Sequence, residues 1–356
     1  MTRDNRIDGW RGISVALVIF GHFILYRYVE FFPVLPFREL STSSPEAIWT
    51  LLWNILARPL ATFPSLGVSV FFVISGYLIT SLMQAETEKQ GSVNMVAFWV
   101  RRCFRILPAL AAYIVGLVVL SSMGFISLSF ENIFVASTFR CNFLFSQCGW
   151  WLGHTWSLAV EEQFYLVWPI LFVFTPRRWK LPLLIILALF FIGLSIWTFK
   201  AQPFAHIAIG SIFGLWPALR EQFARYVRAW HVYKSIAVLL LVPFAASLPF
   251  GQFLSAFNCL FVTIVFFGTV QGHGPLVGIV SNAWMQKLGL ISYSVYLWQQ
   301  LFTGEVQLYT SMPWLSFPLL LFIPAIISYR FIEKPAVDLG RQVSSWLSNA
   351  ARRSMK

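Results

Sequence analysis

Three polar residues near the start of the chain have types and a spacing that suit proton transfer. Asp8, Arg11 and His22 lie in RIDGWRGISVALVIFGH, a segment that is otherwise largely apolar. In a helix, Asp8 and Arg11 are one turn apart, and Arg11 and His22 are nearly eclipsed at roughly 16 Å along the axis. Neutral histidine suits the removal of a hydroxyl proton near neutral pH. His22 is therefore a candidate general base; the alternative is a histidine that only hydrogen-bonds a neighbouring helix.

An arginine cluster in RRCFRILP has the chemistry to bind phosphate. Arg102 and Arg105 are three residues apart, so their guanidinium groups share one helix face and could grip phosphate oxygens bidentately, with Arg101 assisting. The alternative is an ordinary basic flank at the inner end of a membrane helix. The sequence leaves both interpretations open.

The segment HTWSLAVEEQFYLVWP places carboxylates about one turn inside an apolar helix, where their burial is costly. Glu161 and Tyr165 are i, i+4 neighbours and could orient a cationic or hydroxyl partner; the alternative is a pair of interfacial carboxylates at a helix start. His154 lies just outside this helix and could bind an acceptor molecule, although a loop histidine is more often only solvated. No metal-ligand cluster, phosphate loop or dinucleotide fingerprint is visible, so no metal and no permanently bound cofactor are expected.

Membrane helices must position these residues. Of the 356 residues, 58% are hydrophobic and only 11% are charged, which argues against a water-soluble fold. Apolar runs of spanning length recur along the chain without the two-residue alternation of a membrane barrel. The sequence predicts an all-α, polytopic integral membrane protein with about ten transmembrane helices. They cover approximately 12–32, 65–83, 106–126, 157–175, 181–199, 203–219, 235–250, 253–271, 288–307 and 313–332.

The net charge of +12 follows membrane topology and does not indicate nucleic acid binding. If the N-terminus is cytoplasmic, most of the 26 lysines and arginines fall on the inner side, as the positive-inside rule requires. Both termini are then predicted to be cytoplasmic. The first run has no small-x-small cleavage site after it, so it is interpreted as a retained helix. Residues 1–340 are predicted to form the membrane domain, and 341–356 a short basic cytoplasmic tail.

Smaller signals concern packing and covalent links. Gly210 and Gly214 form a GxxxG pair, which is typical of close helix packing. Cys141 and Cys148 fall in a predicted outer loop, where an oxidising periplasm would allow a disulfide; the sequence leaves this open. Glu333 in FIEKP could pair with a basic residue or only with water.

Six motifs in the same order and placement resemble those of the acyltransferase-3 family of membrane acyltransferases. They are RIDGWRGISVALVIFGH, FFVISGYLIT, RRCFRILPAL, HTWSLAVEEQFYLVWP, ISYSVYLWQ and FIEKP. The resemblance spans nearly the whole chain, and its most specific element is Arg11, ten residues, then His22. It implies ten transmembrane helices, cytoplasmic acyl-CoA as co-substrate, and O-acylation of a surface or envelope glycan in the bacterial inner membrane.

Matched motif by motif, the resemblance marks Arg11 and His22 as essential and Arg102 and Arg105 as donor-side residues. It also highlights Asp8, Glu161 and Tyr165. The family usually has a histidine after YLW, whereas this chain has Gln299, which can hydrogen-bond but cannot titrate. Many relatives also carry a C-terminal hydrolase-like periplasmic domain, which this sequence does not show. Acceptor recognition is therefore expected from the membrane domain, its outer loops or a partner protein.

The function expected from the sequence is transfer of an acyl group, with acetyl preferred, from acyl-CoA to a hydroxyl of an envelope glycan or lipid-linked saccharide. His22 would be the base, and direct transfer is preferred to an acyl-enzyme because no nucleophile stands out. Membrane lipids and envelope-biosynthesis proteins are the other expected partners. The main alternative is a transporter or flippase in which His22, Glu161 and Arg11 line a path. A catalytically silent scaffold is the third hypothesis.

Overall fold

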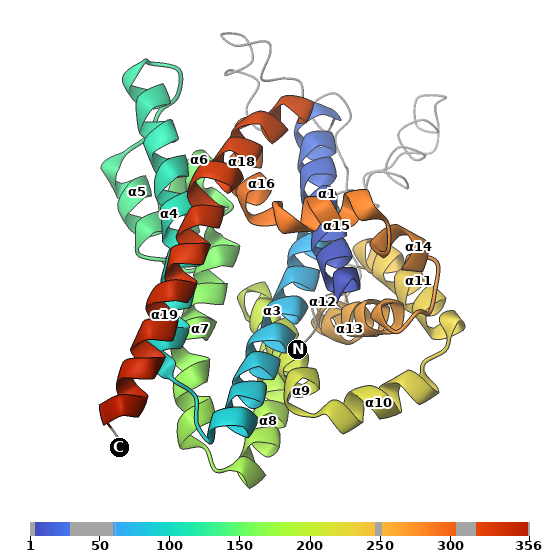
Figure 1. Ribbon diagram of the computed structural model, residues 1–356. Helices are drawn as coiled ribbons and strands as arrows, with labels where there is room; N and C mark the ends of the chain where they lie inside the picture. The colour runs from blue at the N-terminus through green and yellow to red at the C-terminus, as the bar shows by residue number, and fades with distance from the viewer. Residues whose placement is uncertain (1–3, 29–59, 61, 246–250, 304–317, 355–356) are drawn as a thin grey trace, which may run out of the picture. The chain divides into compact units, whose positions relative to one another are not determined.

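The computed structural model describes residues 4–28, 60, 62–245, 251–303 and 318–354, and every regular element in these ranges is a helix (Figure 1). The all-α class is therefore confirmed. The chain forms two compact units. Unit 1 comprises Met1–Ser81 and Leu181–Ser292, and unit 2 comprises Leu82–Lys180 and Tyr293–Lys356.

Several helices meet the requirements for crossing a membrane. Within the described ranges, five qualify by length and hydropathy, and a sixth is obtained if the bent pair α10–α11 counts as one span. The five are α3 (Phe63–Gln90), α4 (Met95–Ser122), α7 (Trp156–Phe174), α8 (Arg177–Ser195) and the segment formed by α12 and α13 (Gly251–Val270). The total of about ten helices and the cytoplasmic termini stay predictions.

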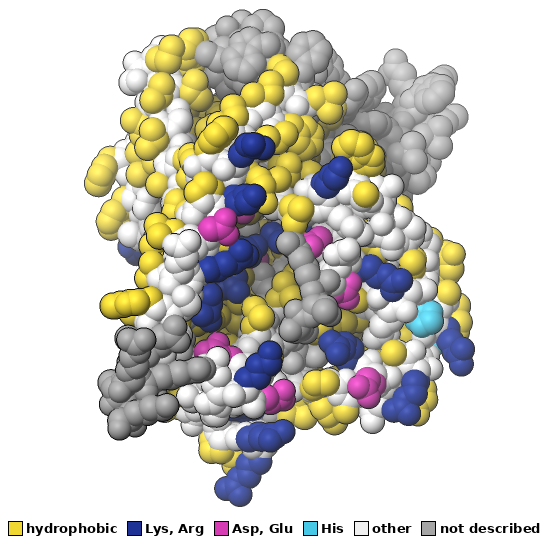
Figure 2. Space-filling model, in the orientation of Figure 1, with side chains coloured by type: hydrophobic (Ala, Val, Ile, Leu, Met, Phe, Trp, Pro, Cys, Tyr) yellow, Lys and Arg dark blue, Asp and Glu magenta, His cyan; other side chains and the backbone are white. Residues whose placement is uncertain are grey.

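Large hydrophobic side chains remain exposed along these helices. On α4 they include Val115 and Val119, and on α8 they include Ile186, Leu189 and Phe190. Figure 2 shows hydrophobic side chains over much of the visible surface. Contiguous exposed apolar surface of this kind is unfavourable in water but suits contact with lipid. The protein is therefore a membrane protein.

In unit 1, α1 (Asn5–Tyr28) lies directly against α14 (Val277–Val280) and α15 (Ala283–Leu290). This close approach requires glycine at three positions, Gly9, Gly12 and Gly289. A Cβ atom at any of them would overlap a backbone carbonyl of the facing segment. The carbonyl that Gly289 faces belongs to Asp8. Such glycine contacts bring helix backbones together where no hydrophobic driving force between helices exists in lipid.

The same device joins α3 to α9 (Gln202–Leu215) in unit 1. A Cβ atom at Gly210 would overlap the carbonyl of Val73, and one at Gly214 would meet the carbonyl of Tyr77. The packing role predicted for this GxxxG pair is confirmed.

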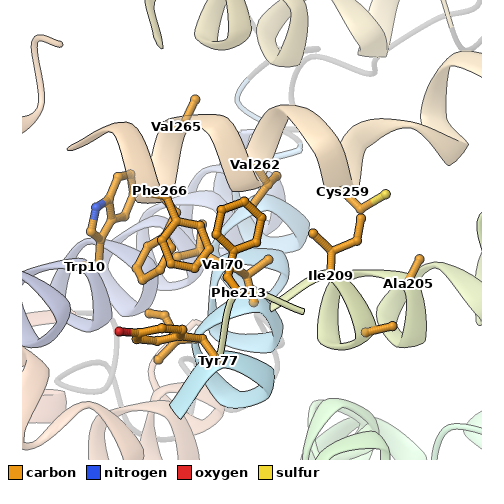
Figure 3. Close-up of a cluster of buried hydrophobic side chains, with 14 of the residues drawn as sticks. Trp10, Val70, Tyr77, Ala205, Ile209, Phe213, Cys259, Val262, Val265 and Phe266 are labelled. Carbon is orange, nitrogen blue, oxygen red and sulfur yellow. The ribbon is translucent and has the colours of Figure 1, made fainter. Parts of the chain in front are cut away.

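Side chains from α1, α3, α9 and α13 (Asn258–Val270) form the hydrophobic core of unit 1 (Figure 3). Trp10 packs on Phe266 with ring centroids 6.0 Å apart, and Phe213 stacks on Phe267 at 4.2 Å. Tyr77 meets Phe267 edge-on at 5.3 Å. Aromatic contacts of these geometries add to the stabilisation from burial. This core fixes α1, which carries the first set of candidate residues.

The helix α10 (Pro217–Tyr226) turns sharply into α11 (Ala229–Ala245), with an angle of 95° between α10 and Ala229–Phe244. α11 then packs along α13. Arg220 of α10 donates a hydrogen bond from Nη1 to the hydroxyl of Tyr77 at 2.5 Å. This contact attaches α10 to the core of unit 1.

In unit 2, α4 packs against both α7 and α19 (Lys334–Ser354) (Figure 1). α4 begins at Met95, whereas the predicted span begins at residue 106, because hydropathy windows avoid the arginines that this helix contains. α19 is continuous through residue 340, where the predicted membrane domain ends. Gly340 faces the ring of Phe104, so this part of α19 packs closely on α4.

The helix expected over 288–307 is interrupted. α15 ends at Leu290, α16 covers Ser292–Trp298, and the 3₁₀ helix η4 covers Gln299–Leu301. The expected helix over 313–332 is described from residue 318 and changes type without a break, from η6 (Pro318–Leu321) to α18 (Phe322–Ser328), a π-helical turn, η7 (Tyr329–Glu333), and then α19. Hydropathy reports only that both segments are apolar, so it locates neither the interruption nor the change of helix type.

A small folded cap precedes α7 in unit 2. It consists of α5 (Phe130–Ser137), η2 (Phe145–Cys148) and α6 (Gly149–Gly153). Cys141 and Cys148 are joined by a disulfide, which the sequence left open. The Asn132 side chain donates to the carbonyl of Gln147 at 2.8 Å, so the loop is tied to α5 as well.

Candidate functional site

Unit 1 contains the residues predicted from the first helix. Arg11 Nη1 and Asp8 Oδ1 are 3.9 Å apart, and both side chains are largely buried, at 14% and 11% exposure. Their one-turn spacing on α1 thus brings the two side chains into an ion pair. Because α1 continues unbroken from Asn5 to Tyr28, the partly buried His22 lies three turns further along the same face, roughly 16 Å from Arg11 along the axis.

Unit 2 contains the arginine cluster on α4. The guanidinium carbon of Arg102 lies 5.1 Å from the ring centroid of Tyr165 and 5.5 Å from that of Phe98. Arg105 is its electrostatic neighbour one turn further on. Both side chains are partly buried, and within the part of the chain that the structure describes neither guanidinium group has a hydrogen-bond acceptor.

Arg101 differs from the other two arginines. Its Nη2 atom lies 3.5 Å from Glu86 Oε2, and 37% of its side chain is exposed. The assisting role predicted for Arg101 thus competes with an existing ion pair. Only Arg102 and Arg105 share a face that is directed at α7 and α16.

The arginines do not form a flank at a helix end. Trp99 donates from Nε1 to the carbonyl of Tyr165 at 3.0 Å, which fixes this part of α4 beside the middle of α7. Arg102 therefore lies beside the middle of an apolar helix. A basic flank would lie at a helix end, so this position favours the binding interpretation over the positive-inside one.

Two adjacent glutamates of α7 lie near these arginines and have different environments. Glu161 Oε2 accepts a hydrogen bond from the Tyr165 hydroxyl at 3.2 Å, which their i, i+4 spacing allows. Glu162 Oε1 is buried and has no hydrogen-bond partner among the residues that the structure describes. Both carboxylates are electrostatic neighbours of Arg102. We refer to Arg102, Arg105, Glu161, Glu162 and Tyr165 as the charged cluster.

Residues from α16 and η7 complete its surroundings within unit 2. Tyr293 donates to the carbonyl of Ile106 at 2.9 Å and is an electrostatic neighbour of Glu162 and Glu333. Ser294 donates to Glu333 Oε2 at 2.7 Å, so the buried Glu333 pairs with a hydroxyl and not only with water. π-Helical turns such as the one that ends at Glu333 occur frequently at functional sites. Glu162 was predicted only as one of two buried carboxylates without a role, and Tyr293 and Ser294 were not predicted as site residues; polar residues inside apolar runs were the available signal.

The two remaining candidates are buried in unit 2. His154 is only 5% exposed, and its ring meets that of Tyr113 edge-on at 5.6 Å. The expectation of a solvated loop histidine is therefore wrong, because α6 and α16 enclose it: its carbonyl accepts from Tyr296 at 2.7 Å. Gln299 is fully buried, and its Oε1 accepts from Thr303 at 2.9 Å.

The structure thus gathers Arg102, Arg105, Glu161 and Tyr165 in unit 2, while Asp8, Arg11 and His22 lie on one helix of unit 1. Their roles stay predictions, as do those of His154 and Gln299. Among the described ranges, no group of three or more potential metal ligands occurs.

Comparison with known proteins extends these observations. A sequence model of an acyltransferase domain matches residues 4–332. The chain is similar to the peptidoglycan O-acetyltransferase OatA of Listeria monocytogenes, with 29% identity over 317 residues, which cover 76% of this chain and 51% of that protein. It is also similar to the O-acetyltransferase OatA of Staphylococcus aureus, with 25% identity over 340 residues, 79% of this chain and 54% of that one. The chain spans about half the length of these curated relatives. No solved structure matches it.

Proposed function

The chain belongs to the acyltransferase-3 family, and from this we propose that it is a bacterial inner-membrane O-acyltransferase that uses cytoplasmic acyl-CoA to acylate a hydroxyl of a cell-envelope glycan. Acetyl is the proposed acyl group because the relatives are named O-acetyltransferases. A peptidoglycan-like polymer is the first acceptor to test, since one relative carries that substrate in its name.

The observation that carries this proposal is the pair of arginines without protein acceptors. Three other arginines have partners: Arg101 pairs with Glu86, Arg6 donates to the carbonyl of Val270, and Arg220 donates to Tyr77. Arginines of the described ranges that lack an acceptor, such as Arg177 and Arg225, are exposed, whereas Arg102 and Arg105 are partly buried. Arg102 and Arg105 instead leave their N–H donors unused by the described residues. Guanidinium groups bind phosphate oxygens bidentately, and acyl-CoA carries a pyrophosphate and a ribose phosphate. We therefore place the donor phosphates at these two arginines.

The reaction itself needs a base and an aligned thioester. In the proposed step, His22 takes the proton of the acceptor hydroxyl, and the hydroxyl oxygen forms a bond to the thioester carbonyl carbon. The carbon–sulfur bond then breaks, and the CoA thiolate leaves with the proton that His22 took, which restores the neutral imidazole. Arg11, held by Asp8, supplies positive charge on the helix face that carries His22. Glu161 orients Tyr165, whose ring supports Arg102.

Transfer of label from radiolabelled acetyl-CoA tests this function. Membranes that contain the wild-type protein should incorporate label into the glycan fraction, and the His22→Ala variant should not, although it still binds CoA. His231→Ala is a matched control, because His231 accepts a hydrogen bond from the backbone of Arg228 outside either candidate group. Full transfer by His22→Ala at normal abundance would contradict the role of His22. Proton-driven movement of a glycan without use of acyl-CoA would instead support the transporter.

A further inference from the structure

The charged cluster and its neighbour Glu333 contain more carboxylates than cations. Arg102 and Arg105 contribute two positive charges, while Glu161, Glu162 and Glu333 contribute up to three negative ones. All five groups lie within unit 2. A phosphate-bearing donor adds further negative charge to this site. Like charges in a low-dielectric setting repel strongly, so anion binding there favours neutralisation of one carboxylate.

Two of the three carboxylates already have hydroxyl donors. Tyr165 donates to Glu161, and Ser294 donates to Glu333. Hydrogen bonds to a carboxylate stabilise its charged form. Glu162 lacks such a donor on its buried Oε1 within the described part of the chain, and it is an electrostatic neighbour of Glu161, Arg102 and Arg105. Of the three carboxylates, Glu162 is therefore the one whose charged form is least stabilised by hydrogen bonds, and the one that is most readily protonated.

We propose that Glu162 takes up a proton when acyl-CoA binds, and that the protonated carboxyl group donates a hydrogen bond to a phosphate oxygen held by Arg102 and Arg105. This inference rests on the proposed function. The proton comes from solvent, and no covalent bond other than the new O–H bond forms. The buried oxygen of Glu162, which has no protein partner in the described ranges, gains one in the complex. Cys103 and Tyr293 are further titratable groups of the described residues that neighbour Glu162. Both are neutral near pH 7 in their ordinary forms and add no charge.

Proton uptake has a definite signature in binding. If one proton enters with the donor, acyl-CoA affinity falls by about tenfold for each unit that the pH rises. This dependence holds between the pH at which Glu162 titrates in the free protein and the pH at which it titrates in the complex. Calorimetric titration of the full-length protein in nanodiscs with acetyl-CoA, in buffers of different ionisation enthalpy, counts the protons directly. In the pH range where Glu162 is ionised in the free protein and protonated in the complex, the wild type should take up about one proton, and Glu162→Gln about none. The ribose phosphate of the ligand titrates equally in both proteins, so the difference between them isolates Glu162.

Controls keep the inference falsifiable. Glu86→Gln removes a carboxylate of unit 2 that pairs with Arg101, and it should retain wild-type proton uptake. Glu162→Asp keeps a titratable group and should also retain uptake, but over a lower pH range because aspartate has a lower ordinary pKa. If Glu162→Gln does not fold, an unshifted pH range in Glu162→Asp would overturn the assignment. Unchanged uptake in folded Glu162→Gln, loss of uptake in Glu161→Gln alone, or donor binding by the wild type without uptake would overturn the assignment. Absence of acetyl-CoA binding by the wild type at any pH would instead overturn the proposed function.

Discussion

Removal of the Arg102 side chain should weaken acyl-CoA binding strongly. The guanidinium group lies 5.1 Å from the Tyr165 ring centroid and has no hydrogen-bond acceptor among the described residues, so one or two of its N–H groups can serve the ligand. Hydrogen bonds to charged groups contribute about 1.5–3 kcal/mol each. A loss of about 2–4 kcal/mol corresponds to a roughly 30-fold to roughly 1,000-fold increase in Kd for Arg102→Ala. Arg102→Lys keeps the charge but loses the planar fork, so its loss should be smaller.

Arg101 provides the matched control for this measurement. Arg101→Ala removes an arginine from the same helix turn, but one that is partly exposed and paired with Glu86. Exposed ion pairs contribute about 0–1 kcal/mol, so donor affinity should change by less than about fivefold. Equilibrium binding of radiolabelled acetyl-CoA to each variant in nanodiscs measures the three constants. An Arg102→Ala protein that binds as tightly as the wild type, or an equal loss in Arg101→Ala, would refute the placement of the donor phosphates.

Three other changes test the surroundings of the candidate residues. Gly289→Ala should lower the free energy of unfolding by about 1–3 kcal/mol because the new Cβ atom overlaps the Asp8 carbonyl. In Gly193→Ala the Cβ atom meets open space, so the free energy of unfolding should rise by up to about 1 kcal/mol. Denaturant titration compares the two variants. Joint replacement of Cys141 and Cys148 by serine should lower the free energy of unfolding by about 2 kcal/mol, since the bond closes a short loop with a separation of seven residues; an equal response of both proteins to reductant would contradict this. Tyr165→Phe removes the hydroxyl that reaches Glu161 but keeps the ring beside Arg102, so acetyl-CoA affinity should change by less than about fivefold; a loss as large as that of Arg102→Ala would show that the hydroxyl itself matters.

Relations within one helix were predictable from the sequence. The Asp8–Arg11 pair and the Glu161–Tyr165 hydrogen bond follow from helical spacing alone, and the structure contains both. The helical class likewise follows from long apolar runs that cannot leave backbone groups unpaired in lipid. Each of these relations depends only on local geometry, which the chain determines within a few residues.

Relations between helices were not predictable in the same way. Hydropathy placed Arg102 at the border of a span, but its level is set by Tyr165 and the Trp99 hydrogen bond, which are contacts to a different helix. The partner of Glu333 is Ser294, which is 39 residues distant in the sequence. Periodicity contains no information on which helix faces which. The same reason explains why Glu162 was predicted as a buried carboxylate but given no role: much of its environment comes from α4 and α16.

The glycine contacts of α1 also restrict how the enzyme can move. Where Gly9, Gly12 and Gly289 bring backbone against backbone, no flexible side chain remains between the helices to change rotamer and absorb a displacement. Sliding or rotation of α1 against α15 would drive each glycine's neighbouring side chains into the facing backbone. The two helices should therefore move together as one rigid body. Any motion that admits a substrate to His22 must then occur on the other sides of α1, or carry α15 with it.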